Sequence, residues 1–145
     1  MNINIERIDR NSVYFQRLVE LGIKLWPDNS YNDLYDEFKN SNHIFFGATF
    51  NNYLIGFIQI SIRTDYVNGS TTSPVGFIEG IFVDENYRKK GIARKLVDRA
   101  VSYFKNEGIK EIASDVLIDN IDSQNFHKSI GFEEIERVVC YIKRI

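Results

Sequence analysis

The alternation of apolar and polar residues predicts one strand and two helices at the start of the chain. Ile3 to Ile8 alternates with a period of two, as a strand with one buried face does. From Ser12 to Leu25 the apolar residues recur every three or four positions, which is typical of an amphipathic helix, and Pro27 would end it. A second, acidic helix is predicted to follow an Asn or Ser N-cap and to end near Asn40.

The middle of the chain is rich in β-forming residues. His43 to Phe50 and Tyr53 to Arg63 are two such runs, and the Asn51–Asn52 pair between them predicts a hairpin. After a loop rich in Asn, Gly, Ser and Thr, the stretch from Val75 to Val83 is almost entirely apolar and predicts a buried strand. The sequence therefore predicts three consecutive strands in this region.

Helical and extended patterns alternate in the second half of the chain. Gly91 to Asn106 carries an apolar stripe at helical spacing, and Gly108 is placed to cap its C-terminus. Ile112 to Ile118 predicts a fifth strand, Ser123 to Ile130 a short helix, and Phe132 to Ile145 a last strand or pair of strands. This order of elements predicts an α/β fold.

Composition and charge fit a single domain over residues 1–145. The chain is 43% hydrophobic and 14% aromatic, which is ample for one packed core. Its formal net charge is -2, so no overall basic field would drive binding to nucleic acid, and a charged partner is expected to be a cation. The N-terminal segment has no long apolar run, so neither a signal peptide nor a membrane span is predicted.

The single cysteine, Cys140, cannot form an intramolecular disulfide, so a reduced, cytoplasmic protein is expected. We expect its side chain to be buried in the last strand, because no catalytic triad spacing accompanies it. Only His43 and His127 could join it as metal ligands, and their spacing matches no known cluster, so no metal is expected. His43, at the start of a strand, is interpreted as structural.

A basic turn, RKKGIAR at 88–94, lies between a buried strand and the start of a helix. A helix N-terminus has free N–H groups and a positive dipole end, and small residues such as Gly91 and Ala93 would let a phosphate approach them. One interpretation is therefore a pyrophosphate cradle built from the amides of residues 89–94. The other is a solvated basic turn whose glycine starts a helix. The pattern is neither a Walker A motif nor the dinucleotide-binding G-x-G-x-x-G.

One acid, Glu79, interrupts the apolar strand before that turn. An unpaired carboxylate in this setting is costly to desolvate, so it must be paired, solvated by a cleft or used in chemistry. Gly80 beside it suggests a β-bulge, which would splay the strand from its neighbour and open a slot. Asp115 lies in the next predicted strand, so two acids are expected at one cleft. Two separate structural salt bridges are the alternative.

Three motifs in this order carry a family resemblance: the apolar strand, RKKGIA at the helix start, and N-x-x-x-x-x-F-H-K-S-I-G-F at 120–132. Together they resemble the GNAT superfamily of acetyl-CoA-dependent N-acetyltransferases over essentially the whole chain. A narrower likeness is to the aminoglycoside 6′-N-acetyltransferases, the drug-modifying resistance enzymes. It rests on KLW at 24–26, SIRTDYVNGSTTSPVGFIEGIFV at 61–83, ASDVLIDN at 113–120 and HKSIGFEEIERVV at 127–139.

The resemblance implies a GNAT fold, in which a mixed central sheet is splayed between strands four and five and flanked by about four helices. The pantetheine arm of acetyl-CoA would insert into the splay like an extra strand, and the pyrophosphate would rest on the basic turn. The implied cofactor-binding residues are Ile81, Phe82, Val83, Arg88, Lys89, Lys90, Gly91, Ile92, Ala93, Arg94 and Asn120. A homodimer is also expected, from the resemblance and from the apolar run VVCYI near the C-terminus.

Around the aminoglycoside, the resemblance implies an aromatic residue from the first helical region and acids from strands four, five and six. The implied substrate-binding residues are Trp26, Tyr66, Glu79, Asp115 and Glu136. Taken alone, Trp26 would be interpreted as a core residue, and Glu136, in the run EEIER, as a charge facing solvent. The acidic balance of the chain suits a polycationic sugar.

The implied reaction is direct attack of the 6′-amine on the thioester. An alkylammonium has a pKa of about 10, so the acceptor must lose a proton, and Glu79 is the predicted general base, directly or through water. Backbone N–H groups near residues 81–83 would stabilise the tetrahedral oxyanion. Many superfamily members protonate the CoA thiolate with a tyrosine at the place where this chain has His127. His127 is therefore the candidate general acid, and a purely structural histidine is the alternative.

Two other functions stay open on the sequence alone. One is an acetyltransferase for a different amine, such as a polyamine or a protein N-terminus. The other is a CoA-binding module without catalysis, against which Glu79, Asp115 and the YVNG loop argue.

Overall fold

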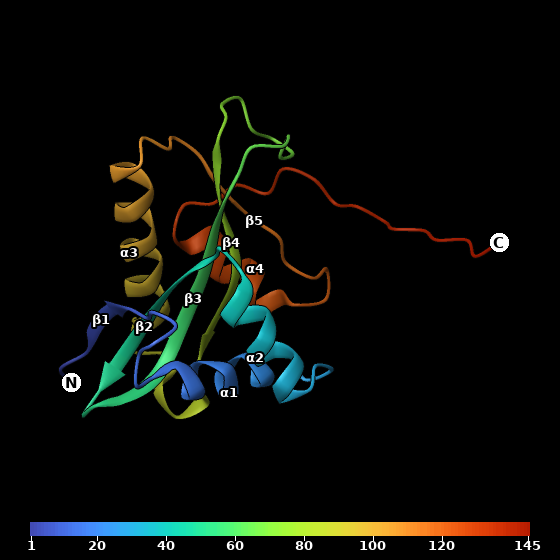
Figure 1. Cartoon of the computed structure of the whole chain (residues 1–145). Helices are drawn as coiled ribbons and strands as arrows, with labels where there is room; N and C mark the ends of the chain where they lie inside the picture. Colours follow the sequence, from blue (N-terminus) through green and yellow to red (C-terminus); the bar gives the residue numbers. More distant parts are fainter.

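The computed structural model describes all residues, 1–145, and contains one five-stranded sheet with helices on both faces (Figure 1). The elements are β1 (Asn4–Arg7), α1 (Phe15–Leu25), α2 (Tyr31–Asn40), β2 (Ile44–Phe50), β3 (Tyr53–Arg63), β4 (Val75–Val83), a 3₁₀ turn (Glu85–Tyr87), α3 (Ile92–Asn106), β5 (Ile112–Ser114) and α4 (Ile121–Ser129). Strands β1 to β4 are antiparallel neighbours in sequence order, and β5 lies parallel to β4. The predicted mixed sheet is therefore confirmed.

Local sequence signals account for most element boundaries. Asn51 and Asn52 both have positive φ, 51° and 60°, which is the backbone that a two-residue hairpin requires, and Asn tolerates it better than most residues. The Ser30 side chain accepts a hydrogen bond from the Asp33 N–H and so caps α2, as predicted. Gly91 precedes the first residue of α3, and Gly108 follows its end with a positive φ of 78°.

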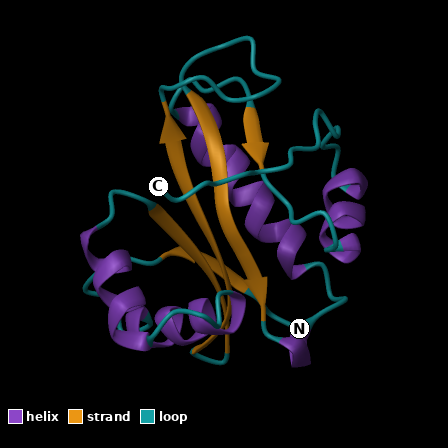
Figure 2. Ribbon diagram, turned by 90° about the vertical axis from the view of Figure 1, so that its right-hand side faces the viewer, coloured by secondary structure: helices purple, strands orange, loops and turns teal.

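Two hydrophobic clusters hold the helices against opposite faces of the sheet (Figure 2). On one face, Leu96, Ala100 and Phe104 of α3 pack onto the central strands. On the other, Leu18 of α1 and Phe38 of α2 are buried against β2 and β3. Burying one such large side chain contributes about 1.5–3 kcal/mol, so both layers are well anchored.

A β-bulge lies where the sequence predicted one. Gln59 of β3 is opposite Gly80 of β4 and Ile60 is opposite Ile78, so Glu79 has no partner in β3. The extra residue turns Glu79 and Gly80 toward the same face, the one covered by α1. A Cβ on Gly80 would lie 2.5 Å from the Trp26 ring, so this glycine lets the indole lie directly on the strand.

Strands β4 and β5 separate soon after they meet. They pair only through Gly76–Ile112, Phe77–Ala113 and Ile78–Ser114, whereas β4 continues to Val83. Beyond Ile78 the β5-facing edge of β4 therefore has no strand beside it. The predicted splay between strands four and five is confirmed, and it begins at the bulge.

The fifth strand is shorter than predicted. It ends at Ser114 instead of Ile118, so Asp115 lies outside it. Leu117 and Ile118 are 76% and 62% exposed, because the chain leaves the diverging β4 and turns toward α4. Without a neighbouring backbone to pair with, an apolar run does not remain in a sheet.

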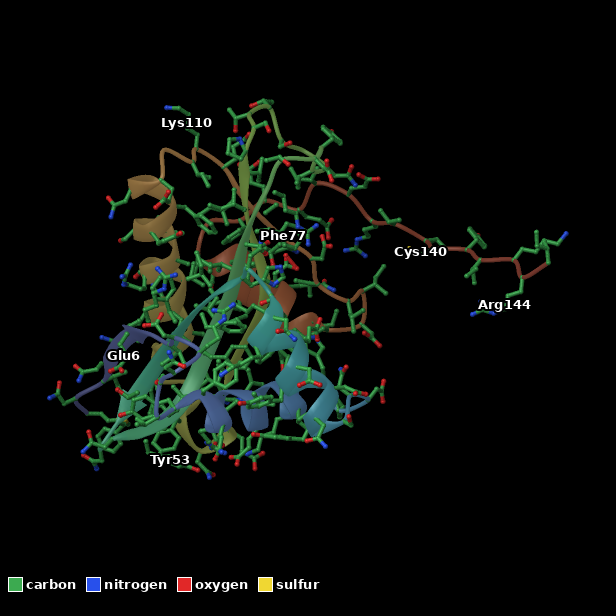
Figure 3. All side chains as sticks on the ribbon, in the orientation of Figure 1. Glu6, Tyr53, Phe77, Lys110, Cys140 and Arg144 are labelled. Atoms are coloured by element: carbon green, nitrogen blue, oxygen red, sulfur yellow. The ribbon has the colours of Figure 1, made fainter.

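The predicted strand or strand pair over Phe132 to Ile145 is also wrong. No strand forms after α4, and the chain passes the β3–β4 loop at Ile135 before it runs away from the body of the protein (Figure 1). Cys140, expected to be buried, is exposed on this segment, and Arg144 lies further out still (Figure 3). A strand needs a partner edge, and this segment has none within its own chain. None of the helices has the length and apolar character that crossing a membrane would require.

Candidate active site

The free edge of β4 carries unpaired backbone groups. The Asp84 N–H donates to the Ile55 carbonyl oxygen at 2.8 Å, so Asp84 faces β3. Because backbone groups alternate in direction along a strand, the N–H groups of Val83 and Ile81 face the open edge instead. The Val83 carbonyl accepts from Arg88 Nε at 2.9 Å. The Ile81 and Val83 amides are thus available to an extended ligand in the splay.

A cavity of about 190 Å³ adjoins the end of this edge. Its lining residues are Val83, Tyr87, Arg88, Lys89, Gly91, Ile92, Ala93, Arg94 and Phe126. The structure therefore brings together most of the predicted cofactor-binding residues of the basic turn with the end of β4. Lys90 is exposed beside them but does not line the cavity.

The start of α3 has free backbone donors and open space in front of them. Gly91 and Lys89 have positive φ values of 76° and 61°, which turns the backbone sharply into the helix. No side chain caps this 15-residue helix, so its first N–H groups have no partner in the protein. A Cβ on Gly91 would meet no protein atom within 4 Å, so the space in front of it is open to a ligand. These features favour the cradle over the solvated turn.

Glu79 is paired in the free protein. Its carboxylate accepts hydrogen bonds from Ser61 Oγ at 2.6 Å and from Arg63 Nη2 at 2.9 Å to each oxygen. The Arg63 guanidinium also lies over the Phe77 ring, 3.5 Å from its centroid. The salt-bridge alternative therefore applies to Glu79. Ser61 and Arg63 share one face of β3, but their sequence does not say that Glu79 of the neighbouring strand lies beside them.

Asp115 differs from Glu79 in its exposure and in its partners. It is the first residue after β5, it is exposed, and it forms no ion pair. The expectation that it is a buried acid in a strand is wrong, because β5 ends one residue earlier. Ile78 and Ser114 form the last pair of the two strands, so Glu79 and Asp115 immediately follow the point of divergence on either side.

The aromatic candidates lie in different settings. Trp26 ends α1 and is half-buried, with its ring over Gly80 and 6.4 Å from the Phe57 ring centroid. It thus joins the core and also borders Glu79. Tyr66 is 77% exposed in the β3–β4 loop, where it lines a polar cavity of about 390 Å³.

Glu111 ties down the loop that carries Tyr66. Its Oε1 accepts hydrogen bonds from Thr72 Oγ1 at 2.5 Å, from the Thr71 N–H at 2.8 Å and from the Thr72 N–H at 2.7 Å. These hydrogen bonds hold the pKa of the Glu111 carboxyl below its ordinary value, and the bond from the Thr72 hydroxyl has the largest effect. No motif in the sequence singles out this residue, which lies just before β5.

Glu136 lies on the exposed C-terminal segment, away from the acids of the sheet. The start of that segment touches the β3–β4 loop, since a Cβ on Gly69 would lie 2.8 Å from the Ile135 side chain. Glu136 therefore follows directly after a residue that contacts the β3–β4 loop. It forms no hydrogen bond or ion pair with Glu79.

His127 bridges α4 and β5. Its Nδ1 lies 2.7 Å from the Ser123 carbonyl oxygen, which can only accept, so Nδ1 carries a hydrogen. Its Nε2 lies 2.9 Å from Ser114 Oγ, at the last paired residue of β5. The ring is therefore held structurally and also faces the point where the strands diverge.

Two predicted residues have structural partners of their own. Asn120 caps α4, because its Oδ1 accepts from the Ser123 N–H at 3.1 Å. His43 Nδ1 lies 2.8 Å from Gln59 Nε2, in line with the structural role expected for it. No group of three or more His, Cys, Asp or Glu side chains is placed to hold a metal ion.

Curated relatives of similar length are enzymes. An aminoglycoside N(6′)-acetyltransferase type 1 of Salmonella enteritidis is 39% identical over 138 residues, which cover 92% of this chain and 95% of that protein. A protein of the same name from Salmonella typhimurium is 42% identical over 125 residues, covering 83% of this chain and 86% of its own.

Solved structures show the same likeness. The structure of AAC(6′)-Iy in complex with the bisubstrate analogue CoA-S-monomethyl-acetylneamine matches with a TM-score of 0.88 and 36% identity, and covers 100% of both chains. AAC(6′)-Ih from Acinetobacter baumannii matches with a TM-score of 0.87 and 36% identity over 99% of each chain. Residues 11–132 match the model of the acetyltransferase (GNAT) family. By sequence and by fold, this chain belongs to the GNAT family of acetyltransferases.

Proposed function

We propose that this protein transfers the acetyl group of acetyl-CoA to the 6′-amino group of aminoglycoside antibiotics and so confers resistance to them. The observation that carries the proposal is the likeness, over the whole chain, to an enzyme solved with CoA joined to an acetylated aminoglycoside fragment. The unpaired edge of β4 and the anion cradle at its end would accommodate the CoA part of such an analogue.

The residues of the cradle fit acetyl-CoA. The free amides at the start of α3, with Arg88, Lys89, Lys90 and Arg94 around them, would hold the pyrophosphate. The unpaired edge of β4 from Ile81 to Val83 would pair with the pantetheine amides, as a strand would. Asn120, at the start of α4, would hold the pantetheine or thioester region.

The acceptor approaches from the face where Glu79 and Trp26 lie. Glu79 holds the ammonium group and takes up the proton that must leave before attack, directly or through one water. Trp26 and Tyr66 flank the sugar, while Asp115 and Glu136 orient its other ammonium groups. An N–H on the open edge of β4 then stabilises the oxyanion that attack creates, a contribution of roughly 3 kcal/mol for a well-placed donor.

His127 supplies the proton that the departing CoA thiolate needs. When the imidazole is protonated, both ring nitrogens donate, one to the Ser123 carbonyl and the other to Ser114 Oγ. The ring is fixed by these contacts at the divergence of β4 and β5, where the thioester is expected. An imidazolium N–H at this place can donate its proton to the thiolate.

Release of CoA thiol with different acceptors tests the proposed reaction. We expect turnover with a kanamycin-type aminoglycoside and none, or far less, with spermidine or a peptide N-terminus. Turnover with spermidine or a peptide but with no aminoglycoside would instead indicate an acetyltransferase for another amine. Binding of CoA without turnover of any amine would indicate a binding module.

A homodimer is proposed as the working assembly. Val139, Tyr141 and Ile142 on the C-terminal segment are 74%, 92% and 80% exposed, although such a run of apolar side chains is rarely left in water. The sheet ends at β5, so β5 has a free edge. The segment of one copy would pair with the sheet of a second copy, which would also bring Glu136 to an acceptor site.

Sedimentation at micromolar concentration tests the dimer. We expect the wild-type protein to sediment as a dimer and the Tyr141→Asp/Ile142→Asp double variant as a folded monomer. A wild-type monomer would contradict the proposed assembly. Because acetyl-CoA and the reduced state of a lone cysteine both belong to the cytoplasm, we propose that the enzyme acts there.

A further inference from the structure

Glu79, the proposed base and ammonium site, already holds a cation in the free protein. Arg63 Nη2 lies 2.9 Å from both carboxylate oxygens, and Ser61 Oγ donates to one of them at 2.6 Å. These bonds occupy three of the about four acceptor positions of the carboxylate. An ammonium group can therefore make more than one contact with these oxygens only if one of the donors leaves.

The two donors differ in how easily they can leave. Ser61 is 8% exposed and lies inside β3, opposite Phe77. Arg63 is the last residue of β3, and its side chain is 41% exposed. Only one nitrogen of its guanidinium contacts Glu79, while the plane rests on the Phe77 ring. The Arg63 side chain can thus swing into solvent without breaking the strand, and Ser61 cannot.

We propose that Arg63 occupies the position of the substrate ammonium group, and that the acceptor exchanges with it on binding. Arg63 is a positioning residue: it holds the carboxylate of Glu79 in a fixed orientation while no substrate is bound. In the exchange one cation leaves and one arrives, so Glu79 is never left uncompensated. This inference rests on the proposed function, because it assigns the ammonium site of that reaction.

The exchange also bears on selectivity among amines. An acceptor must displace a guanidinium that has a hydrogen-bonded carboxylate and an aromatic ring as partners. An amine with a single positive charge has only this one contact with which to compete. A polycationic sugar retains further ion pairs with the surrounding acids, such as Asp115, while it displaces Arg63. The contact with Arg63 therefore favours polyvalent acceptors over simple amines.

Calorimetric binding of a kanamycin-type aminoglycoside, without acetyl-CoA, tests the exchange. Arg63→Gln removes the competing cation, and we expect the aminoglycoside Kd to fall about threefold or more, as is typical when an ion pair of this exposure is lost. Arg63→Lys keeps the charge and should bind like the wild type. Two measurements serve as controls for folding. The Kd of acetyl-CoA should stay within about twofold of the wild-type value, and the urea midpoint of unfolding within about 0.3 M, as expected for a surface substitution.

The Glu79→Gln background separates exchange from general repulsion between Arg63 and a polycation. There we expect Arg63→Gln to change the Kd by less than about 1.5-fold, because the site of competition is gone. The same gain in both backgrounds would overturn the proposal in favour of long-range repulsion. Weaker binding by Arg63→Gln in the wild-type background would also overturn it and would make Arg63 a support for the bound sugar. Failure of the proposed function would be seen separately, as a wild-type protein that acetylates no aminoglycoside.

Discussion

The two halves of the proposed site differ in whether backbone or side-chain groups form them. The proposed acetyl-CoA half is formed largely by backbone, along residues 81–83 and 88–94, which are nearly continuous in sequence. The proposed acceptor half is formed by side chains from the end of α1, the β3–β4 loop, β4, the end of β5 and the C-terminal segment. The first half is complete within one chain, whereas the second has Glu79 occupied by Arg63 and Glu136 on a segment that leaves the body.

Backbone donors can be held ready for a ligand in the free protein, whereas a cluster of acids needs the substrate's positive charges to complete it. A turn with fixed φ values and an uncapped helix presents its amides whether or not a ligand is bound. A cluster of acids cannot be left in the same way, because neighbouring unpaired carboxylates repel one another and lose solvation. The protein keeps Glu79 paired and Asp115 and Glu136 exposed, and we propose that the polycationic substrate brings these acids together.

Replacing the proposed base should have the largest effect on turnover. Glu79→Gln keeps a side chain of the same shape that can still accept from Ser61 but cannot take up a proton. We expect kcat to fall about 100-fold or more, with little change in the Kd of acetyl-CoA. Steady-state thiol release and calorimetry measure the two quantities. Undiminished turnover across the pH profile would remove Glu79 from the chemistry and leave it as a cation contact.

The acetyl-CoA half should be broken by filling its cradle. Gly91→Val places a branched side chain at a φ of 76°, in the space where phosphate is expected, so we expect the Kd of acetyl-CoA to rise about 10-fold or more and aminoglycoside binding to be preserved.

Gly108→Val is a matched control for this change. It lies at the other end of α3 with a φ of 78° and also faces open space, so it carries the same backbone cost of roughly 1–2 kcal/mol. Equal loss of acetyl-CoA affinity in both variants would attribute the effect to strain in α3 and not to the cradle.

The contrast between local backbone and distant side chains also explains what could be predicted from the sequence. The bounds of β3 and β4, the glycine before α3 and the bulge at Glu79 follow from local patterns, because each depends on backbone geometry that a few neighbouring residues dictate. The cradle was predictable for this reason. Its role as the acetyl-CoA site remains a prediction.

Pairings between distant residues were not predictable in this way. The partners of Glu79 come from β3, and they lie beside it through the pairing register of the two strands, which neither strand's own pattern specifies. The short β5 and the exposed Cys140 depend on which edges are available for pairing, and an apolar run alone does not specify its partner. The residues of the acceptor half were implied by family resemblance, and their contacts with substrate remain predictions.

A smaller effect is expected in the acceptor half from Asp115. Asp115→Asn removes an exposed charge beside the divergence of β4 and β5, so we expect the KM for aminoglycosides to rise roughly threefold, the acetyl-CoA KM to stay constant, and the salt dependence of binding to become flatter. Asp119→Asn, which removes an exposed acid further along the same connection, is the control. Identical changes in the two variants would point to net charge alone.

The smallest effect should come from the tether of the Tyr66 loop. The pKa of Glu111 is lowered in the folded protein by hydrogen bonds from Thr72 and Thr71, so its stabilisation is fully present above its ordinary value of 4.5 and is lost as pH falls through the lower, folded-state pKa. At neutral pH, Glu111→Gln keeps one acceptor, and we expect the aminoglycoside KM to change less than about twofold.

Amide hydrogen exchange reports on this tether directly. The Thr71 and Thr72 amides should exchange faster in Glu111→Gln than in the wild type, while the amides of α3 are unaffected. Glu107→Gln, at the end of α3, should leave both sets unchanged. Protection of Thr71 and Thr72 that does not depend on Glu111 would show that the loop is ordered by other contacts.

The position of the acetyl group on the product tests the arrangement of the two halves most directly. If Glu79 holds the amine that faces the thioester at the splay, NMR of the product from a kanamycin-type substrate should place the acetyl group on the 6′-nitrogen. An analogue with a hydroxyl at the 6′ position should then bind without being N-acetylated. An acetyl group on a ring amine at another position, or N-acetylation of the 6′-hydroxyl analogue, would contradict the proposed geometry.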